Sequence, residues 1–204
     1  ITEVDRYKRV FDGACGSGSF LVQAMVKELA DCENAIMTDE RKKELKEKVK
    51  KNNIFGVEIE EGVFGLSTTN MLIHGDGNSN IKLGSLFDNK DFFKKADPDI
   101  VLMNPPYNAK PRTIPDSYKT NWTTKQKNGK EDPTKGLSFA EFISDCVEEM
   151  NKERVEKGES KKEVKLAILL PVATAIGSNK VLKSAKEKML VNNTLEAVFT
   201  LPNE

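Results

Sequence analysis

The chain has 204 residues, 38% hydrophobic and 31% charged, a composition that fits a globular domain with a substantial core and excludes a disordered chain. It carries 32 basic and 32 acidic side chains, so no overall positive charge marks a nucleic-acid partner, and such a contact would need a local patch or a partner subunit. Three cysteines without CxxC spacing predict reduced thiols in a cytoplasm, and we expect no membrane association because no apolar run approaches about 20 residues and no signal peptide is visible.

Short apolar segments alternate with segments of helical character along the chain. In chain order, the expected strands are residues 9–12, 54–59, 80–85, 99–103, 163–171 (which we expect to be fully buried) and 194–202. The expected helices are 19–31, 39–51 (a solvated, charged helix), 60–75, 137–157 and 179–193. This alternation predicts an α/β fold with a doubly wound, mostly parallel sheet, in one domain over residues 1–204. Because each end of the chain lies close to a strand, we expect a fragment of a longer protein.

The stretch DGACGSGSF, residues 12–20, lies where the first strand turns into the first helix. Its glycines let the backbone approach a ligand closely, and the start of the helix offers N–H groups and a positive dipole to a carboxylate or phosphate. The spacing is not GxGxxG, so pyrophosphate binding is not the first choice. An ordinary tight turn is the alternative, but three glycines between residues 13 and 18 favour a ligand loop.

Glu58 ends the second expected strand. A carboxylate at this edge of the sheet can accept hydrogen bonds from both hydroxyls of a ribose. The alternative is a carboxylate that only stabilises the start of the next helix. The glycine loop nearby favours the ribose interpretation.

The sequence NPPY, residues 104–107, follows the fourth expected strand. An amine or amide nitrogen conjugated to a π-system is a poor nucleophile, because its lone pair is delocalised. Two hydrogen-bond acceptors placed against its N–H groups would draw the nitrogen toward tetrahedral geometry. The Asn104 side-chain oxygen and the Pro105 carbonyl are such acceptors, and the prolines hold them rigidly. Tyr107 offers a ring on which a planar substrate can stack. A simple Asn-Pro turn is the alternative.

DGACGSGSF, FGVEI and NPPY, in this order, resemble the amino N6-adenine DNA methyltransferases, and most of all the modification subunit of type I restriction–modification systems. The resemblance covers nearly the whole chain. It implies a Rossmann-like fold and S-adenosylmethionine as cofactor. Its methionine end would lie on the glycine loop and its ribose on Glu58, and the resemblance assigns the loop to Asp12, Gly13, Ala14, Cys15, Gly16, Ser17 and Gly18.

The resemblance also implies that the target adenine is flipped out of the DNA duplex. Asn104 and Pro105 would bind its amino group, Pro106 would stiffen the motif and Tyr107 would stack on the ring, with no metal. Two positions depart from the family pattern. Gly13 replaces the usual proline, and Ser85 stands near the place of an acidic residue that contacts the cofactor adenine, a role that Asp88 could also fill.

Residues 108–136 form a long expected loop with seven basic residues, from Lys110 and Arg112 to Lys135. We expect this loop to contact DNA phosphates, with Lys125, Lys127 and Lys130 contributing and Trp122 as an anchor. A metal site is not expected, because one histidine and three scattered cysteines give no ligand spacing. His74 is expected to end a helix, and Cys15 to be a packing residue.

The leading hypothesis is the catalytic domain of an adenine-N6 DNA methyltransferase that works with a separate DNA-specificity subunit and a restriction subunit. A protein-glutamine methyltransferase could use the same NPPY residues on a side-chain amide, and transfer of label to protein would favour it. The third possibility is a scaffold subunit that no longer catalyses. Ser85 supports it, because an acidic residue that contacts the cofactor usually stands near this position.

Overall fold

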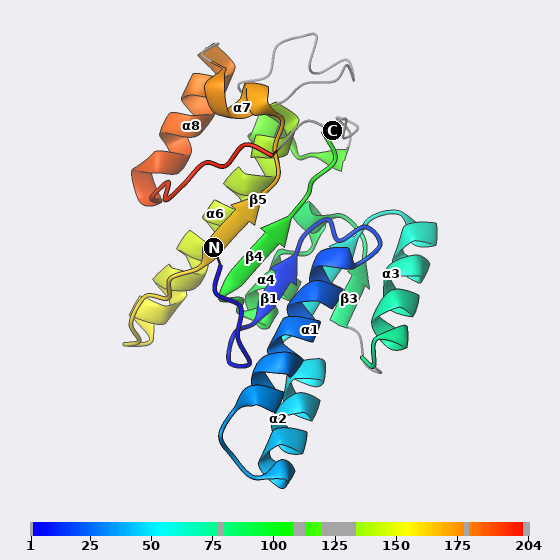
Figure 1. The fold of residues 1–204 in the computed structure, drawn as a ribbon. Coiled ribbons are helices and arrows are strands. Elements are labelled where there is room, and N and C mark those ends of the chain that lie inside the picture. Colours follow the sequence, from blue (N-terminus) through cyan, green and yellow to red (C-terminus); the bar gives the residue numbers. More distant parts are fainter. Residues whose placement is uncertain (1, 77–79, 108–112, 120–133, 178–179, 202–204) are drawn as a thin grey trace. The chain divides into compact units, whose positions relative to one another are not determined.

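The computed structural model describes residues 2–76, 80–107, 113–119, 134–177 and 180–201 (Figure 1). The chain divides into two compact units. The first contains residues 1–104 and 162–168, and the second contains residues 105–161 and 169–204.

The first unit is built on a five-stranded sheet in which every pair of neighbours is parallel, in the order β3-β2-β1-β4-β5. Its strands are β1 (Val10–Asp12), β2 (Ile54–Glu58), β3 (Asn80–Leu83), β4 (Ile100–Met103) and β5 (Lys165–Ile168). The strand order reverses at β1, which pairs with β2 on one side and with β4 on the other. This is the doubly wound arrangement that the alternation of strands and helices predicts.

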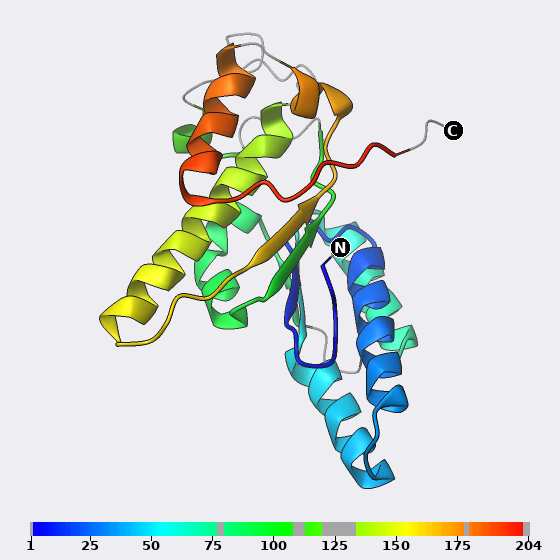
Figure 2. The ribbon, with the colours of Figure 1, turned by 60° about the vertical axis from the view of Figure 1, so that its left-hand side comes forward.

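Helices cover both faces of this sheet. α1 (Ser19–Asn34) lies on one face and α4 (Lys90–Ala96) on the other (Figures 1 and 2). Successive side chains of β1 divide between the two faces, because Val10 joins the core cluster of α1 while Phe11 contacts the ring of Phe93 in α4 edge-on, with centroids 4.9 Å apart. α2 (Asp39–Asn52) packs beside α1, and α3 (Glu61–Ile73) contacts α1 and β3.

The core on the α1 face consists of apolar side chains from α1, α2, α3 and the strands. Its fully buried members include Val10, Leu21, Met25, Cys32, Val49, Ile54, Met71 and Ile100. α2 contributes only Leu45 and Val49, and the rest of this helix is charged and mainly solvated, as the sequence predicts. Its start is capped by Thr38, whose hydroxyl accepts the Arg41 N–H.

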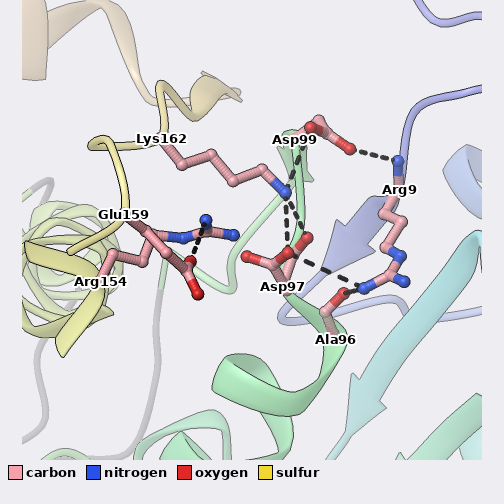
Figure 3. A network of polar contacts seen from close by, with 7 residues as sticks. All are labelled: Arg9, Ala96, Asp97, Asp99, Arg154, Glu159 and Lys162. Atoms are coloured by element: carbon pink, nitrogen blue, oxygen red, sulfur yellow. Dashed lines mark hydrogen bonds and ion pairs between the residues drawn. The ribbon is translucent and has the colours of Figure 1, made fainter. Parts of the chain in front are cut away.

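A network of charged groups ties the amino-terminal ends of β1, β4 and β5 together (Figure 3). The Lys162 ammonium donates to the Asp97 carbonyl at 2.6 Å and lies 3.2 Å from the carboxylates of both Asp97 and Asp99. Asp99 in turn accepts the backbone N–H of Arg9 at 2.8 Å. Because these residues stand just before three adjacent strands, the network fixes the edge of the sheet opposite to the strand ends that carry the predicted motifs.

The second unit is helical where it is described, with η3 (Asp116–Lys119), α6 (Thr134–Glu156), α7 (Val172–Ile176) and α8 (Lys180–Asn192). Leu137, Leu182 and Ala185 form its buried cluster, with Leu170 and Met189 against it. The Tyr118 hydroxyl donates to the Asp145 carboxylate at 2.8 Å and so joins η3 to α6. Asn193 donates to the Ser144 hydroxyl at 2.7 Å and joins the end of α8 to α6.

Two expectations about the elements were wrong, and the helix α4 was not foreseen. Residues 194–201 do not form the sixth strand, because they have no hydrogen-bonded partner in the described chain; alternation of apolar side chains cannot replace a partner. β5 is half-buried and not fully buried, because it is the last strand in the sheet order. α4, which lies between β3 and β4, was not expected, since seven residues are too few to show a helical period.

Most of the predicted basic loop, including Lys110, Arg112, Trp122, Lys125, Lys127, Lys130 and the side chain of Lys135, lies outside the described residues. Among the helices that are described, none is both long and apolar enough to span a bilayer.

Candidate active site

Four of the predicted site positions lie at one edge of the sheet of the first unit. Asp12 and Glu58 are the last residues of β1 and β2, Ser85 follows β3 after one glycine, and Asn104 directly follows β4. The four strands are parallel, so their carboxyl ends meet at the same edge. The sheet therefore assembles residues that are separated by up to 92 positions in the sequence.

The glycine loop, residues 12–18, makes a tight turn between β1 and α1. The Cys15 N–H donates to the Val57 carbonyl of β2 at 3.0 Å, and the Gly18 N–H donates to the Cys15 carbonyl at 2.8 Å. Gly16 and Gly18 have φ angles of +56° and +81°, a region that other residues rarely adopt. Gly18 is the N-cap of α1 and provides no side-chain cap, and the first turn holds no acidic residue. The start of this helix thus keeps the electrostatic character of an anion site.

Glu58 connects the end of β2 to the loop. One of its carboxylate oxygens accepts the Gly16 N–H at 2.9 Å and the other accepts the Glu60 N–H at 2.8 Å. The residue is 8% exposed. Each oxygen of a carboxylate can accept more than one hydrogen bond, so both retain acceptor capacity.

Two further polar groups of the loop are buried. Asp12 is 2% exposed and accepts the Ala14 N–H at 3.0 Å. Burial raises the pKa of Asp12 to about 7, a rise that the Ala14 N–H opposes and the Glu58 charge increases. Burial and the charges of Asp12 and Glu58 also raise the pKa of the Cys15 thiol to about 12. The raised pKa favours the neutral thiol, and Cys15 is 6% exposed within the buried core cluster, which fits the packing role expected of it.

Ser85 begins a short turn after β3. Its hydroxyl oxygen accepts the Phe87 N–H at 3.3 Å and caps η1 (Leu86–Asp88), while its carbonyl accepts the Asn89 side-chain amide at 2.7 Å. Gly84, just before it, donates its N–H to the Glu58 carbonyl at 2.8 Å. The turn is thus attached to the end of β2, and the side chain of Asp88 is exposed.

The NPPY residues span the boundary between the two units. Asn104 is the last residue of this stretch of the first unit, and its side chain is exposed to solvent. Pro105, Pro106 and Tyr107 belong to the second unit; Pro105 is buried, Pro106 is exposed and the Tyr107 ring is 41% exposed. The structure places Asn104 at the same sheet edge as Asp12, Glu58 and Ser85.

Sequence reasoning missed the contribution of α3 to this site. The Asn70 side-chain amide donates to the Ser17 carbonyl at 2.8 Å, and Ser67, which is fully buried, packs against Gly18. Ser67 and Asn70 are three residues apart and so share a face of α3. The sequence feature that could have predicted this contribution is the pair of polar residues, Ser67 and Asn70, beside the buried Met71 on this helix. His74 ends this helix, as predicted.

A doubly wound parallel sheet, with a glycine-rich turn and an acidic residue at the carboxyl ends of adjacent strands, defines a Rossmann-like fold. The family model of the N-6 DNA Methylases matches residues 1–204. The chain belongs to this family.

A known relative agrees with this assignment. The chain is 34% identical over 194 residues to the type II restriction enzyme and methyltransferase RM.BcgI of Heyndrickxia coagulans, a match that covers 94% of this chain. The chain spans only 24% of the length of that relative.

Two solved structures share the fold at lower identity. One is a modification subunit of a putative type I restriction enzyme from Vibrio vulnificus, with a TM-score of 0.59 and 21% identity over 91% of this chain and 34% of that one. The other comes from work on complex assembly and conformational transition of the type I R-M system, with a TM-score of 0.56 and 17% identity over 93% and 33% of the two chains.

Proposed function

We propose that this chain is the catalytic domain that transfers a methyl group from S-adenosylmethionine to the N6 amino group of adenine in DNA. The observation that carries the proposal is the hydrogen bond from the Gly16 N–H to the Glu58 carboxylate, at the edge of the sheet where β4 ends on Asn104. This bond joins a loop suited to a carboxylate with an acceptor suited to a ribose. Membership of the N-6 DNA Methylase family, which generally uses this cofactor, supports the same conclusion.

The residues at this edge fit the cofactor chemically. The first turn of α1 has no acidic side chain and no side-chain cap, so its N–H groups suit the methionine carboxylate. Glu58 keeps acceptor capacity for the two ribose hydroxyls, and Ser85 offers a hydroxyl near the end of β3. We assign the loop residues Asp12, Gly13, Ala14, Cys15, Gly16, Ser17 and Gly18 to the same site.

The cofactor supplies an electrophilic methyl group, and the chain has to supply an activated amino nitrogen. The adenine amino group is a weak nucleophile because its lone pair is delocalised into the ring. The Asn104 side-chain oxygen and the Pro105 carbonyl accept hydrogen bonds from its two N–H groups and stabilise the positive charge that develops as the nitrogen becomes tetrahedral. The rigid prolines align these acceptors, and the exposed Tyr107 ring provides a surface on which a flipped base stacks.

We further propose that a separate subunit recognises the DNA sequence and that a restriction subunit belongs to the same complex. The equal numbers of acidic and basic residues support this, because a domain that bound DNA alone would be expected to carry a net positive charge. The likeness of the fold to a type I modification subunit points in the same direction.

We also propose a cytoplasmic setting for the protein, because its three cysteines are buried and free.

The test is the amount of N6-methyladenine in the DNA of a methylation-deficient host that expresses the full-length protein together with its genetically linked subunits. Mass spectrometry of the hydrolysed DNA should show the modified base for the wild type and for the control Asn34→Ala, an exposed residue at the end of α1. Asn104→Ala should abolish it while cofactor binding persists. Methyl transfer to protein alone, or cofactor binding without any transfer, would replace this proposal with the glutamine or the scaffold alternative.

A further inference from the structure

The peptide unit between Ser17 and Gly18 is held at both of its ends. Its carbonyl oxygen, on Ser17, accepts the Asn70 side-chain amide at 2.8 Å. Its N–H, on Gly18, donates to the Cys15 carbonyl at 2.8 Å. The C=O and N–H of a trans peptide point in opposite directions, so these two bonds together fix which way the unit faces.

This peptide unit would otherwise turn over easily. A peptide flip changes ψ of the first residue and φ of the second, and the second residue here is Gly18, with φ of +81°. Glycine accepts φ of either sign at little cost, so Gly18 itself adds little resistance to the flipped form. The flip would remove the bond to Cys15 and reorient the N-cap residue of α1, whose first-turn N–H groups form the proposed anion site.

α3 provides a rigid support for the donor. Ser67, one turn before Asn70, is fully buried, and a Cβ placed on Gly18 would lie 3.5 Å from its side chain and backbone, which is ordinary van der Waals contact. Met71, next to Asn70, is also fully buried. The helix is therefore packed closely against the loop at the level of Gly18, and the Asn70 amide is presented from a fixed position.

We infer that Asn70 is a positioning residue of the cofactor site, which holds the Ser17–Gly18 peptide in the orientation that binds S-adenosylmethionine. The inference rests on the proposed function. Asn70 acts through the loop. Its loss should therefore weaken cofactor binding without changing the chemical step: KM for the cofactor rises while kcat at saturating cofactor stays the same.

The experiment is a calorimetric titration of S-adenosylmethionine into the full-length protein, with thermal unfolding recorded for each variant. Asn70→Ala should raise Kd about three- to tenfold, the effect of one neutral hydrogen bond. The matched control is Asn80→Ala, because the Asn80 amide donates to the Lys51 carbonyl at 2.9 Å, the same kind of bond at the opposite edge of the sheet. Asn80→Ala should leave Kd unchanged even where it lowers the unfolding midpoint.

A second variant protects the test against misfolding of the first. Asn70→Asp keeps the shape but replaces the donor with an acceptor that repels the Ser17 carbonyl, and it should weaken binding at least as much as Asn70→Ala. Wild-type affinity in the folded Asn70 variants overturns the inference, and so does an equal loss in Asn80→Ala, which would indicate general loosening. Absence of binding by the wild type would instead refute the proposed function on which the inference rests.

Discussion

Leu86 occupies the space that a side chain at position 13 would need. A Cβ built on Gly13 would lie 2.8 Å and 3.0 Å from the two terminal methyl carbons of Leu86 and 3.3 Å from the terminal methyl of Met103. Leu86 is 3% exposed and so has little room to move. The proline that the resemblance leads one to expect at position 13 is thus incompatible with the present packing.

Gly13→Ala should therefore lower the free energy of unfolding by about 1–3 kcal/mol, the usual cost of overpacking. In a Leu86→Ala background the same substitution should cost much less, because the two closest contacts are gone. Gly62→Ala is the matched control, since a Cβ there meets nothing within 4 Å, and it should be neutral or slightly stabilising. Denaturant unfolding of the wild type, Gly13→Ala, Leu86→Ala, their double variant and Gly62→Ala measures these costs, and an equal cost of Gly13→Ala in both backgrounds would contradict the explanation.

Glu58→Gln should weaken the binding of S-adenosylmethionine roughly ten- to a hundredfold, because hydrogen bonds to a charged acceptor are worth about 1.5–3 kcal/mol. The substitution also replaces one of the two oxygens that accept the Gly16 and Glu60 N–H groups. Glu61→Gln, an exposed acidic residue in the first turn of α3, is the control and should bind like the wild type. Equal affinities for the wild type and Glu58→Gln in calorimetry would remove Glu58 from the site.

Glu28 should make the stability of the protein depend on pH. Burial raises the pKa of this fully buried residue to about 8, although the Asn53 amide, 2.7 Å away, opposes the rise. The unfolded chain loses this proton near pH 4.5 and the folded chain only near pH 8. Glu28 therefore contributes its full stability below about pH 4.5, and this contribution is lost as the pH rises to about 8.

The substitution Glu28→Gln removes this titration and keeps an oxygen for Asn53. Its free energy of unfolding should exceed that of the wild type at pH 8, and the difference should shrink as the pH is lowered toward 5. Urea unfolding of both proteins at pH 5, 6.5 and 8 measures the difference. A gap that does not change with pH would show that Glu28 is ionised in the folded protein.

The network at the amino-terminal edge should contribute to stability through Lys162, whose side chain is 17% exposed. Lys162→Met removes the donor to the Asp97 carbonyl and leaves two partly buried carboxylates without this cation. A loss of about 1–3 kcal/mol in the free energy of unfolding is expected. Lys183→Met breaks an exposed pair with Glu187 and should cost less than about 0.5 kcal/mol. Similar losses in both variants would mean that burial adds nothing to the network.

The sequence predicts the elements whose signal is local. Ile54–Glu58 and Ile100–Met103 are apolar runs that end at polar motifs, and the strands form there. α4 was missed, because its packing depends on Phe93 and Ala96 meeting the sheet and a seven-residue segment has no visible period. The strand expected over 194–202 failed for a related reason, because a strand also requires a neighbour.

The site shows the same division between local and tertiary information. Asp12, Glu58, Ser85 and Asn104 could be predicted to converge, because parallel strands end at a common edge. The hydrogen bond from Asn70 to Ser17 joins residues 53 positions apart and has no sequence motif. The contact between Gly13 and Leu86 likewise depends on how the turn after β3 packs, and only the assembled structure reveals it.

The division of the first unit between residues 1–104 and 162–168 has a consequence for its biosynthesis. β5 lies beside β4, but the ribosome must translate residues 105–161 before β5 emerges. Until then the nascent sheet ends at β4, whose unpaired backbone groups can pair with another chain. A translational pause within residues 105–161 would prolong the exposure of the β4 edge. Aggregation during expression should therefore depend on how quickly the ribosome translates this stretch.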